Sequence, residues 1–339
     1  MPWIHVCGGY VEMSSLEVSG LCVGFEAESG QIEILNQVSF NVGKGESIGL
    51  VGESGCGKSM TALAIMGLLP DAAMVSGEVR FDGMDLLTLD DKAMSALRGQ
   101  RIAMIFQEPM TALNPVQSIG DQITEGLRLH MGLGRRAARH KAADLLGRVG
   151  LPVDRFPLGR YPHELSGGQR QRVVIAMALA CHPDILIADE PTTALDVTTQ
   201  GQILDLLVEI AATEDMGLVM ITHDLGVIAE MTDKMLVMYA GSIVEAGPTP
   251  SVFRDMEHPY TRGLFAALPT ADLVGGGRGG ARLPAIPGEV PIAGEALRFG
   301  CAFAPRCARA DARCRSGIPP QVEVGPSHTT ACFHPGGGT

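Results

Sequence analysis

Short apolar runs separated by glycines and charged residues predict β-strands in the first part of the chain. From residue 16 to about residue 51 such runs alternate with turns, and the run at 47–51 has the continuous apolar character of a buried strand. Residues 76–83 predict a further strand and turn. Residues 234–246 predict a hairpin that turns at Ala240-Gly241. The pattern therefore favours a sheet-rich beginning and a later hairpin.

Helical patterns and two further apolar runs indicate an α/β arrangement. Residues 59–69 predict a helix that ends at the following proline, and residues 166–180 predict another helix. Residues 121–149 carry helical spacing with many Arg and Ala, which predicts a helical insertion. Residues 184–188 and 218–222 are apolar runs of the kind that form central parallel strands.

The two ends of the chain differ from its middle. Residues 1–15 show no periodicity and are expected to form a flexible extension. Residues 275–280 read Gly-Gly-Gly-Arg-Gly-Gly, which is typical of a flexible linker. We therefore expect a main domain at residues 16–268, followed by a linker and a tail at residues 269–339.

Composition narrows the class of protein. The chain has 339 residues, of which 46% are hydrophobic and only 4% aromatic, so a large core of aliphatic side chains and Met is expected. The net charge of −12 disfavours nucleic acid as the main partner. No apolar run reaches the roughly 18 to 20 residues that span a bilayer, and the start lacks a secretory signal. We expect a cytoplasmic protein whose membrane role would need a separate membrane partner.

Residues 52–59 carry the clearest chemical motif. They read Gly-Glu-Ser-Gly-Cys-Gly-Lys-Ser, follow a predicted strand and open a predicted helix, as a phosphate-binding P-loop does. The glycines let backbone N–H groups converge on phosphate oxygens at a helix N-terminus. Lys58 can then reach the β- and γ-phosphates, and the Ser59 hydroxyl can bind Mg²⁺. The alternative is a Gly-rich turn that binds nothing.

Two further motifs fit the same chemistry. The predicted strand before Asp189 and Glu190 ends in these two acids, so Asp189 would hold Mg²⁺ through water and Glu190 would polarise the attacking water. Solvated acids at a strand end are the alternative. Residues 165–169, Leu-Ser-Gly-Gly-Gln, precede a helix, and the glycines would let its start approach an anion. An ordinary capped helix is the alternative there.

In combination these motifs resemble the ATP-binding-cassette (ABC) ATPase family. They occur in the family's order: the P-loop, Gln107, Leu-Ser-Gly-Gly-Gln, Asp189-Glu190, and His223 after a strand. The resemblance covers about residues 16–268. It implies an α/β P-loop NTPase core with an antiparallel β subdomain, a helical subdomain at about residues 108–180 and a small Cys-rich C-terminal tail.

The resemblance implies roles for single residues. Glu190, His223 and Gln107 would be catalytic, with His223 at the γ-phosphate and Gln107 sensing the membrane partner. A lone histidine after a strand is otherwise more often a surface residue. Mg²⁺ would be held by Ser59, Gln107 and Asp189. Phe25 would stack on adenine, and the other expected ATP contacts are Gly52, Ser54, Gly55, Gly57, Lys58, Ser59, Ser166, Gly168 and Asp196.

Three other segments indicate which branch of the family the sequence resembles. Residues 106–115, 161–166 and 258–261 resemble the dipeptide and oligopeptide importer ATPases. This resemblance implies an ATP hydrolase that powers peptide import, working at the cytoplasmic face of the membrane. Its expected partners are a second ATPase subunit, two permeases and an extracytoplasmic binding protein. The same branch also contains nickel and glutathione importers, which stay as alternatives for the cargo.

Four of the eight cysteines gather in the tail. Their spacing, Cys301-x5-Cys307-x6-Cys314-x17-Cys332, resembles the segment in which dipeptide-importer ATPases can hold a [4Fe-4S] cluster. Structural zinc usually shows tighter C-x2-4-C pairs, which are absent here. A zinc site or free cysteines are the alternatives.

Two functions from other classes compete with transport. A soluble cassette ATPase acting on DNA or ribosomes usually has a coiled-coil insertion or two cassettes, and this acidic sequence has neither. The second is a degenerate binding partner that does not hydrolyse ATP. The presence of Glu190 and His223 argues against it.

Overall fold

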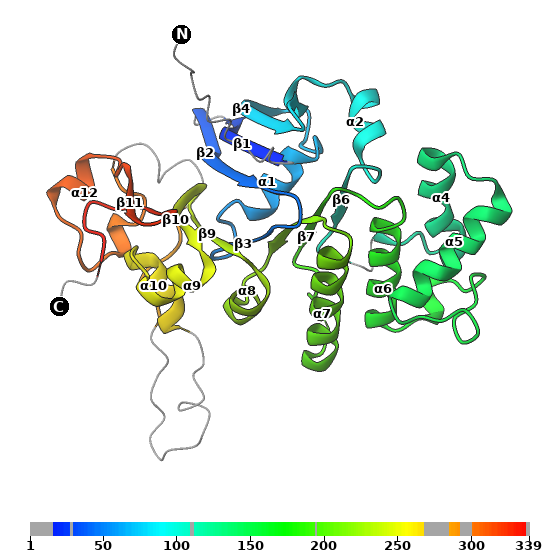
Figure 1. Ribbon diagram of the computed structural model, residues 1–339. Coiled ribbons are helices and arrows are strands. Elements are labelled where there is room, and N and C mark those ends of the chain that lie inside the picture. Colours follow the sequence, from blue (N-terminus) through cyan, green and yellow to red (C-terminus); the bar gives the residue numbers. More distant parts are fainter. Residues whose placement is uncertain are drawn as a thin grey trace, which may run out of the picture.

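Short strands of Ile, Leu, Val and Met form the centre of an eight-stranded sheet (Figure 1). The computed structural model describes residues 16–27, 30–108, 112–193, 195–267, 285–291 and 300–336. The sheet order is β11-β12-β10-β9-β3-β8-β7-β6. Its strands are β3 (Ser47–Val51), β6 (Ile102–Ile105), β7 (Ile185–Asp189), β8 (Gly217–Ile221), β9 (Lys234–Tyr239), β10 (Ser242–Pro248), β11 (Gln321–Gly325) and β12 (His328–Ala331).

Burial on both faces explains why the central strands are apolar throughout. Strands β6, β7, β8, β3 and β9 run parallel, and every residue of β7 and β8 is buried. Neighbouring side chains of β7 point to opposite faces, so Leu186 and Ile187 belong to two different core clusters. The predicted runs at 184–188 and 218–222 are therefore confirmed as central parallel strands.

A second sheet covers one face of the first. It is antiparallel, in the order β2-β1-β4-β5, and consists of β1 (Leu16–Ala27), β2 (Gly30–Val42), β4 (Ala73–Phe81) and β5 (Met84–Asp85). Its apolar residues pack with α1 against one core cluster, whereas α6, α7 and α8 contribute to the other cluster. The predicted α/β core and antiparallel β subdomain are both present.

The helices of the described chain complete the layers. They are α1 (Lys58–Ile65), α2 (Asp91–Leu97), α4 (Ile119–Met131), α5 (Arg135–Arg148), α6 (Gly167–Ala178), α7 (Val197–Thr213), α8 (Leu225–Met231), α9 (Thr249–Asp255), α10 (Pro259–Ala266) and α12 (Ala312–Ser316). Short 3₁₀ turns occur at η1 (Leu86–Thr88), η2 (Pro162–Glu164) and η3 (Ala304–Arg306). Among these helices none is long and apolar enough to cross a bilayer.

The sequence predicted a helix at residues 59–69, and its predicted end is wrong, because α1 stops at Ile65. Gly67 adopts a left-handed conformation with φ 61°. Its N–H donates to Ala64 O, and Leu68 N–H donates to Leu63 O, which satisfies the last carbonyls of the helix. Glycine therefore ends the helix before Pro70 is reached.

The predicted helical insertion at 121–149 forms two helices. Gly132 adopts φ 63° at the end of α4, and α5 begins at Arg135. The buried Ile123 and Leu127 of α4 share a core cluster with Leu145 of α5. Figure 1 shows this pair at one end of the molecule, beyond α6.

The C-terminal segment, residues 300–336, lies at the opposite end of the molecule from α4 and α5 (Figure 1). Its hairpin of β11 and β12 extends the large sheet, because β12 pairs with β10. The carboxylate of buried Glu245 accepts a hydrogen bond from His328, whose Nε2 lies 2.8 Å from Glu245 Oε1. Backbone N–H groups of Glu257 and His258 donate to the same carboxylate. The sequence predicted a tail here, but not its strands. The predicted extension at 1–15 and the linker at 275–280 lie outside the described residues.

His328→Ala tests this attachment. Removing the imidazole leaves the carboxylate of Glu245 buried without one partner, so we expect the free energy of unfolding to fall by about 3 kcal/mol. Urea unfolding at neutral pH measures the change. The matched control is His140→Ala, whose side chain is 84% exposed on α5. A loss no larger than that of the control would contradict the role of His328.

Candidate nucleotide-binding site

The loop at residues 52–59 needs its glycines for space and for backbone conformation. Gly52, Gly55 and Gly57 have φ of 154°, 81° and 107°, a region that side chains rarely allow. A Cβ on Gly52 would lie 2.2 Å from Met238 O, and one on Gly57 would lie 2.6 Å from Leu35 Cδ2. The sequence therefore folds into a tight loop between β3 and α1, as the P-loop motif predicts.

Lys58 lies inside this loop. Its Nζ donates to Gly52 O at 2.8 Å and to Glu53 O at 3.1 Å, and the residue is only 6% exposed. Backbone N–H groups at the start of α1 and the ammonium of Lys58 thus share one small region. Such a region is suited to phosphate oxygens.

Asp189 ends β7 beside the P-loop helix. Burial raises the pKa of its carboxyl, and a hydrogen bond from the Ser59 hydroxyl opposes that shift. Within the described residues its buried Oδ1 has no hydrogen-bond partner. A buried carboxylate oxygen without a partner, next to a hydroxyl, fits a hydrated Mg²⁺ ion because oxygen ligands and water satisfy that ion. Ser59 and Asp189 are therefore a chemically suitable pair for Mg²⁺.

Glu190 brings together the residues predicted to be catalytic. Its Oε2 accepts a hydrogen bond from Gln107 Nε2 at 3.1 Å, and its Oε1 lies 3.4 Å from His223 Nδ1. Gln107, Glu190 and His223 follow the ends of the neighbouring strands β6, β7 and β8. Parallel strands deliver such residues to one edge of the sheet, where ligands bind.

Two local features hold Glu190 in this place. Its backbone adopts φ 45°, a strained conformation for a residue with a side chain, and its N–H donates to Ile221 O of β8. Thr193 also donates to Glu190 Oε2 at 3.1 Å. Sequence reasoning missed Thr193, although its position three residues beyond Glu190, in the turn after the strand, was a usable signal.

Ser166, Gly168 and Asp196 occupy helix starts. Ser166 caps α6 and Asp196 caps α7, and hydrogen bonds from Thr199 lower the pKa of Asp196. A Cβ on Gly168 would lie 2.6 Å from Thr199 Cγ2, so the two helix starts are in contact. In the described chain, Ser166 exchanges hydrogen bonds with Gln169, and Asp196 accepts hydrogen bonds from Thr199, so these bonds are local to the two helix starts.

Phe25 and Ser54 are less defined by contacts. Phe25 lies on β1, is half-buried and packs against the core cluster of the antiparallel sheet. Ser54 lies in the P-loop, next to Gly55. The structure thus places both in the elements that the sequence predicted, without a contact that assigns a role.

The four tail cysteines line one small cavity. Cys301, Cys307, Cys314 and Cys332 surround it, together with His258, Phe333 and His334. Burial raises the pKa values of Cys301, Cys314 and Cys332, and the nearby thiols add to these shifts. A cationic metal centre would offset this cost by favouring the thiolates. The donor set therefore fits four-thiolate binding of a metal or cluster.

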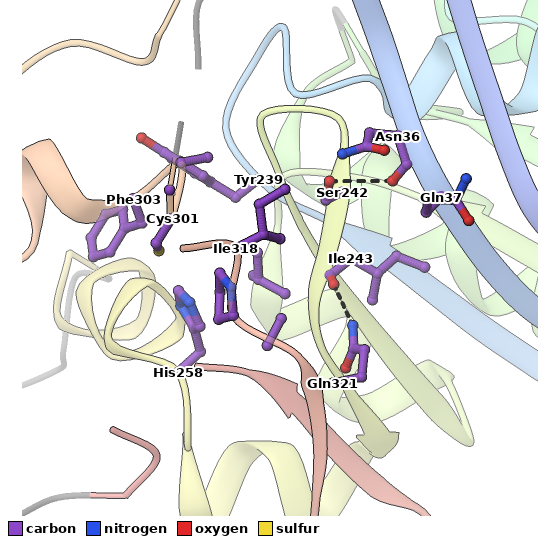
Figure 2. Close-up of a pocket in the computed structure, with 15 residues that line it drawn as sticks. Asn36, Gln37, Tyr239, Ser242, Ile243, His258, Cys301, Phe303, Ile318 and Gln321 are labelled. Carbon is purple, nitrogen blue, oxygen red and sulfur yellow. Dashed lines mark hydrogen bonds between the residues drawn. The ribbon is translucent and has the colours of Figure 1, made fainter. Parts of the chain in front are cut away.

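A larger cavity shares Cys301, Phe303 and His258 with the cysteine cavity. Figure 2 shows Asn36 and Gln37 of β2 across from Cys301 and Phe303 of the C-terminal segment, with His258 nearby. Ser242 donates to Asn36 O, and Gln321 donates to Ile243 O, so both edges of the cavity are tied to the sheet. Burial lowers the pKa of His258 to about 3, so this imidazole is neutral at physiological pH.

A P-loop, a buried acid at the end of β7 and a capped second glycine motif define a nucleotide-binding α/β ATPase. Residues 35–193 match the family model of the ABC transporter, and residues 244–314 match that of the oligopeptide/dipeptide transporter C-terminal region. The chain belongs to the ABC transporter ATPase family and carries this C-terminal region.

Relatives and solved structures agree with this assignment. A Brucella melitensis protein named as a peptide import ATP-binding protein is 49% identical over 326 residues, covering 94% of this chain and 96% of that protein. The dipeptide transport ATP-binding protein DppD of Bacillus subtilis is 47% identical over 320 residues, covering 94% of each. A dimeric post-hydrolysis structure of the ATP-binding cassette MJ0796 with ADP and Pi has a TM-score of 0.62 and 28% identity, covering 69% of this chain and 98% of that one.

Asp189→Asn tests the electrostatics of the site. Because burial raises the pKa of Asp189, the folded chain holds the proton more tightly than the unfolded chain, so stability falls as the pH rises above 3.8. The substitution imitates the protonated acid. We expect the thermal midpoint of EDTA-treated, nucleotide-free protein to rise by about 3 °C near neutral pH. This gain should shrink as the pH falls towards 3.8.

Thermal unfolding across pH measures both effects of Asp189→Asn. The matched control is Asp205→Asn, on the exposed side of α7, which should leave the midpoint unchanged. A midpoint below that of the wild type near neutral pH would contradict the proposed cost of burying the charged carboxylate.

Proposed function

We propose that this chain is the ATP-hydrolysing subunit of an importer for dipeptides and oligopeptides. One observation carries the hydrolytic part: Glu190 contacts both Gln107 and His223 at the edge of the sheet that holds the P-loop. Family membership supports the coupling to peptide import, since the chain has both the ABC ATPase region and the C-terminal region of oligopeptide/dipeptide transporters.

The residues divide the work at the nucleotide. Lys58 and the N–H groups of the P-loop would hold the β- and γ-phosphates. Ser59 and Asp189 would hold Mg²⁺, with Gln107 as a further ligand, and the ion would neutralise charge on the phosphate oxygens. Glu190 would orient and polarise the attacking water, while His223 would contact the γ-phosphate. Phe25, Ser54 and the loop glycines would complete the ATP contacts.

A second ATPase subunit completes the proposed site. Ser166 caps α6 and Gly168 lies in its first turn, so the N–H groups of this helix start would face an anion held elsewhere. Asp196 begins α7 beside them, so the same surface would face the partner subunit. Two such subunits would enclose ATP between the P-loop of one and the Leu-Ser-Gly-Gly-Gln of the other.

The membrane partners follow from the proposed transport. Two permease subunits would form the path through the bilayer, and an extracytoplasmic binding protein would deliver the peptide. The chain would bind the permeases at the cytoplasmic face, through the region around Gln107. The names of the Brucella melitensis and Bacillus subtilis relatives favour peptides over nickel or glutathione as the cargo.

The cysteine cavity supports a [4Fe-4S] cluster as the fourth part of the proposal. The described residues contain one set of three possible ligands within 4.8 Å, namely Asp311, Cys314 and His334, so no three of the four thiols are that close together. Tetrahedral zinc would hold thiolates about 3.8 Å apart, since each zinc–sulfur bond is about 2.3 Å. Wider spacing suits thiolates that bind separate irons of one cluster.

Glu190→Gln tests the catalytic assignment. Loss of the carboxylate removes the group that polarises water, so we expect turnover to fall by about 10²–10⁴-fold while ATP still binds. Steady-state hydrolysis by the reconstituted transporter measures the first effect, and equilibrium ATP binding measures the second. Glu209→Gln, on the exposed face of α7, is the matched control. Unchanged turnover in Glu190→Gln would exclude Glu190 as the catalytic base.

The cluster proposal predicts the colour and metal content of the protein. Anaerobically purified chain should be brown and contain about four irons. Serine at any one of Cys301, Cys307, Cys314 or Cys332 should bleach it, whereas serine at Cys22 or Cys181 should not. Colourless protein with one zinc per chain would refute iron but keep the four thiolates as ligands. Metal-free protein with full transport activity would refute both forms of the site.

A further inference from the structure

Arg306 of the C-terminal segment forms an ion pair with the P-loop. Its Nη1 lies 2.6 Å from Glu53 Oε2, and its Nη2 donates to Glu53 Oε1 at 3.0 Å. The Arg306 side chain is 4% exposed and that of Glu53 is 27% exposed. Two parallel hydrogen bonds of this kind fix the orientation of both groups. Glu53 is the second residue of the P-loop, so the segment contacts the phosphate-binding loop directly.

A second contact holds the backbone of the same residue. The N–H of Glu53 donates to Tyr260 Oη at 2.8 Å, and Tyr260 is fully buried on α10. The carbonyl of Glu53 accepts from Lys58 Nζ at 3.1 Å. Glu53 is thus held by side chain and backbone from outside the loop, and it contacts the lysine inside the loop.

Residues outside the C-terminal segment keep Arg306 in place. The Nε of Arg306 donates to Pro287 O at 2.9 Å, and its guanidinium lies 5.8 Å from the centre of the Tyr239 ring of β9. Phe303 packs edge-on against Tyr239, with ring centres 5.2 Å apart, and also against Tyr260. Figure 2 shows Phe303 beside Cys301 at the cavity wall. These contacts join the segment to the two tyrosines behind the P-loop.

We propose that Arg306 is a positioning residue for ATP binding, which neutralises Glu53 and holds the P-loop in its phosphate-binding form. A carboxylate without a counter-charge in this loop would repel a triphosphate, and the loop would lose one of its restraints from outside. Loss of Arg306 should weaken the affinity for ATP rather than slow hydrolysis. Among the described residues, Arg306 forms no hydrogen bond with Gln107, Glu190 or His223.

Substitution of both partners tests this role. We expect Arg306→Ala to raise the Kd for Mg²⁺–ATP about tenfold, or ~1.4 kcal/mol, while kcat at saturating ATP changes less than about twofold. Arg306→Lys keeps the charge and loses the paired hydrogen bonds, so its Kd should lie between those of the wild type and Arg306→Ala. Adding Glu53→Gln to Arg306→Ala removes the unpaired carboxylate and should restore most of the affinity.

Controls keep the test independent of folding. Arg315→Ala makes the same charge change at an exposed position of the same segment and should bind ATP like the wild type. Thermal unfolding shows whether Arg306→Ala is folded, and Arg306→Lys serves if it is not. An unchanged Kd in Arg306→Ala, or additive effects of Glu53→Gln and Arg306→Ala, would overturn the proposal.

Arg306 also precedes Cys307, so the cysteine cavity and the P-loop share one stretch of chain. This step rests on the proposed cluster. Cys332→Ser should remove the iron and raise the Kd for ATP in the wild-type background, but it should add little in Arg306→Ala. Iron content and visible absorption report the first effect independently of ATP. Colourless wild-type protein in which Arg306 and Glu53 still couple would refute the cluster and leave the role of Arg306 intact.

Discussion

The structure depends on the burial of its parallel strands. Because β6, β7, β8 and β3 have apolar side chains on both faces, their polar residues can occur only where the strands end. Those ends lie along one edge of the sheet, which brings Gln107, Glu190 and His223 together beside the P-loop. The positive φ of Glu190 is a consequence, because the chain must turn there while the carboxylate faces its two neighbours.

The C-terminal segment is part of the same construction. Strand β12 adds to the large sheet beside β10, and buried Glu245 joins it through His328. The attachment places Arg306 against Glu53, so the loop that holds phosphates is supported by Tyr260 of α10 and by Arg306 of the C-terminal segment, both more than two hundred residues away in the sequence. A cysteine site in this segment would therefore include Cys307, which follows directly on the residue that contacts the P-loop.

The parts that sequence predicted are those with local signals. The motif from Gly52 to Ser59 specifies its own turn, and the apolar strand before Asp189 predicts both the strand and the place of its acids. The end of α1 could not be placed, because Gly67 and Pro70 are both stop signals and only the structure shows which one acts. The contacts of Arg306 and Tyr260 with Glu53 were missed because residues more than two hundred positions apart carry no local signal of their pairing. Strands β11 and β12 were missed because they join the sheet through the long-range pairing of β12 with β10, which no local pattern signals.

The central claim is that ATP hydrolysis by this chain powers peptide import, and coupled transport tests it most directly. The measurement is ATP turnover and peptide uptake in proteoliposomes that contain the chain, its partner ATPase and both permeases, with the binding protein supplied outside. We predict that peptide-loaded binding protein raises turnover and that peptide accumulates inside only when ATP is hydrolysed. Turnover that ignores the loaded binding protein, together with no ATP-dependent uptake of any dipeptide or oligopeptide, would contradict the account.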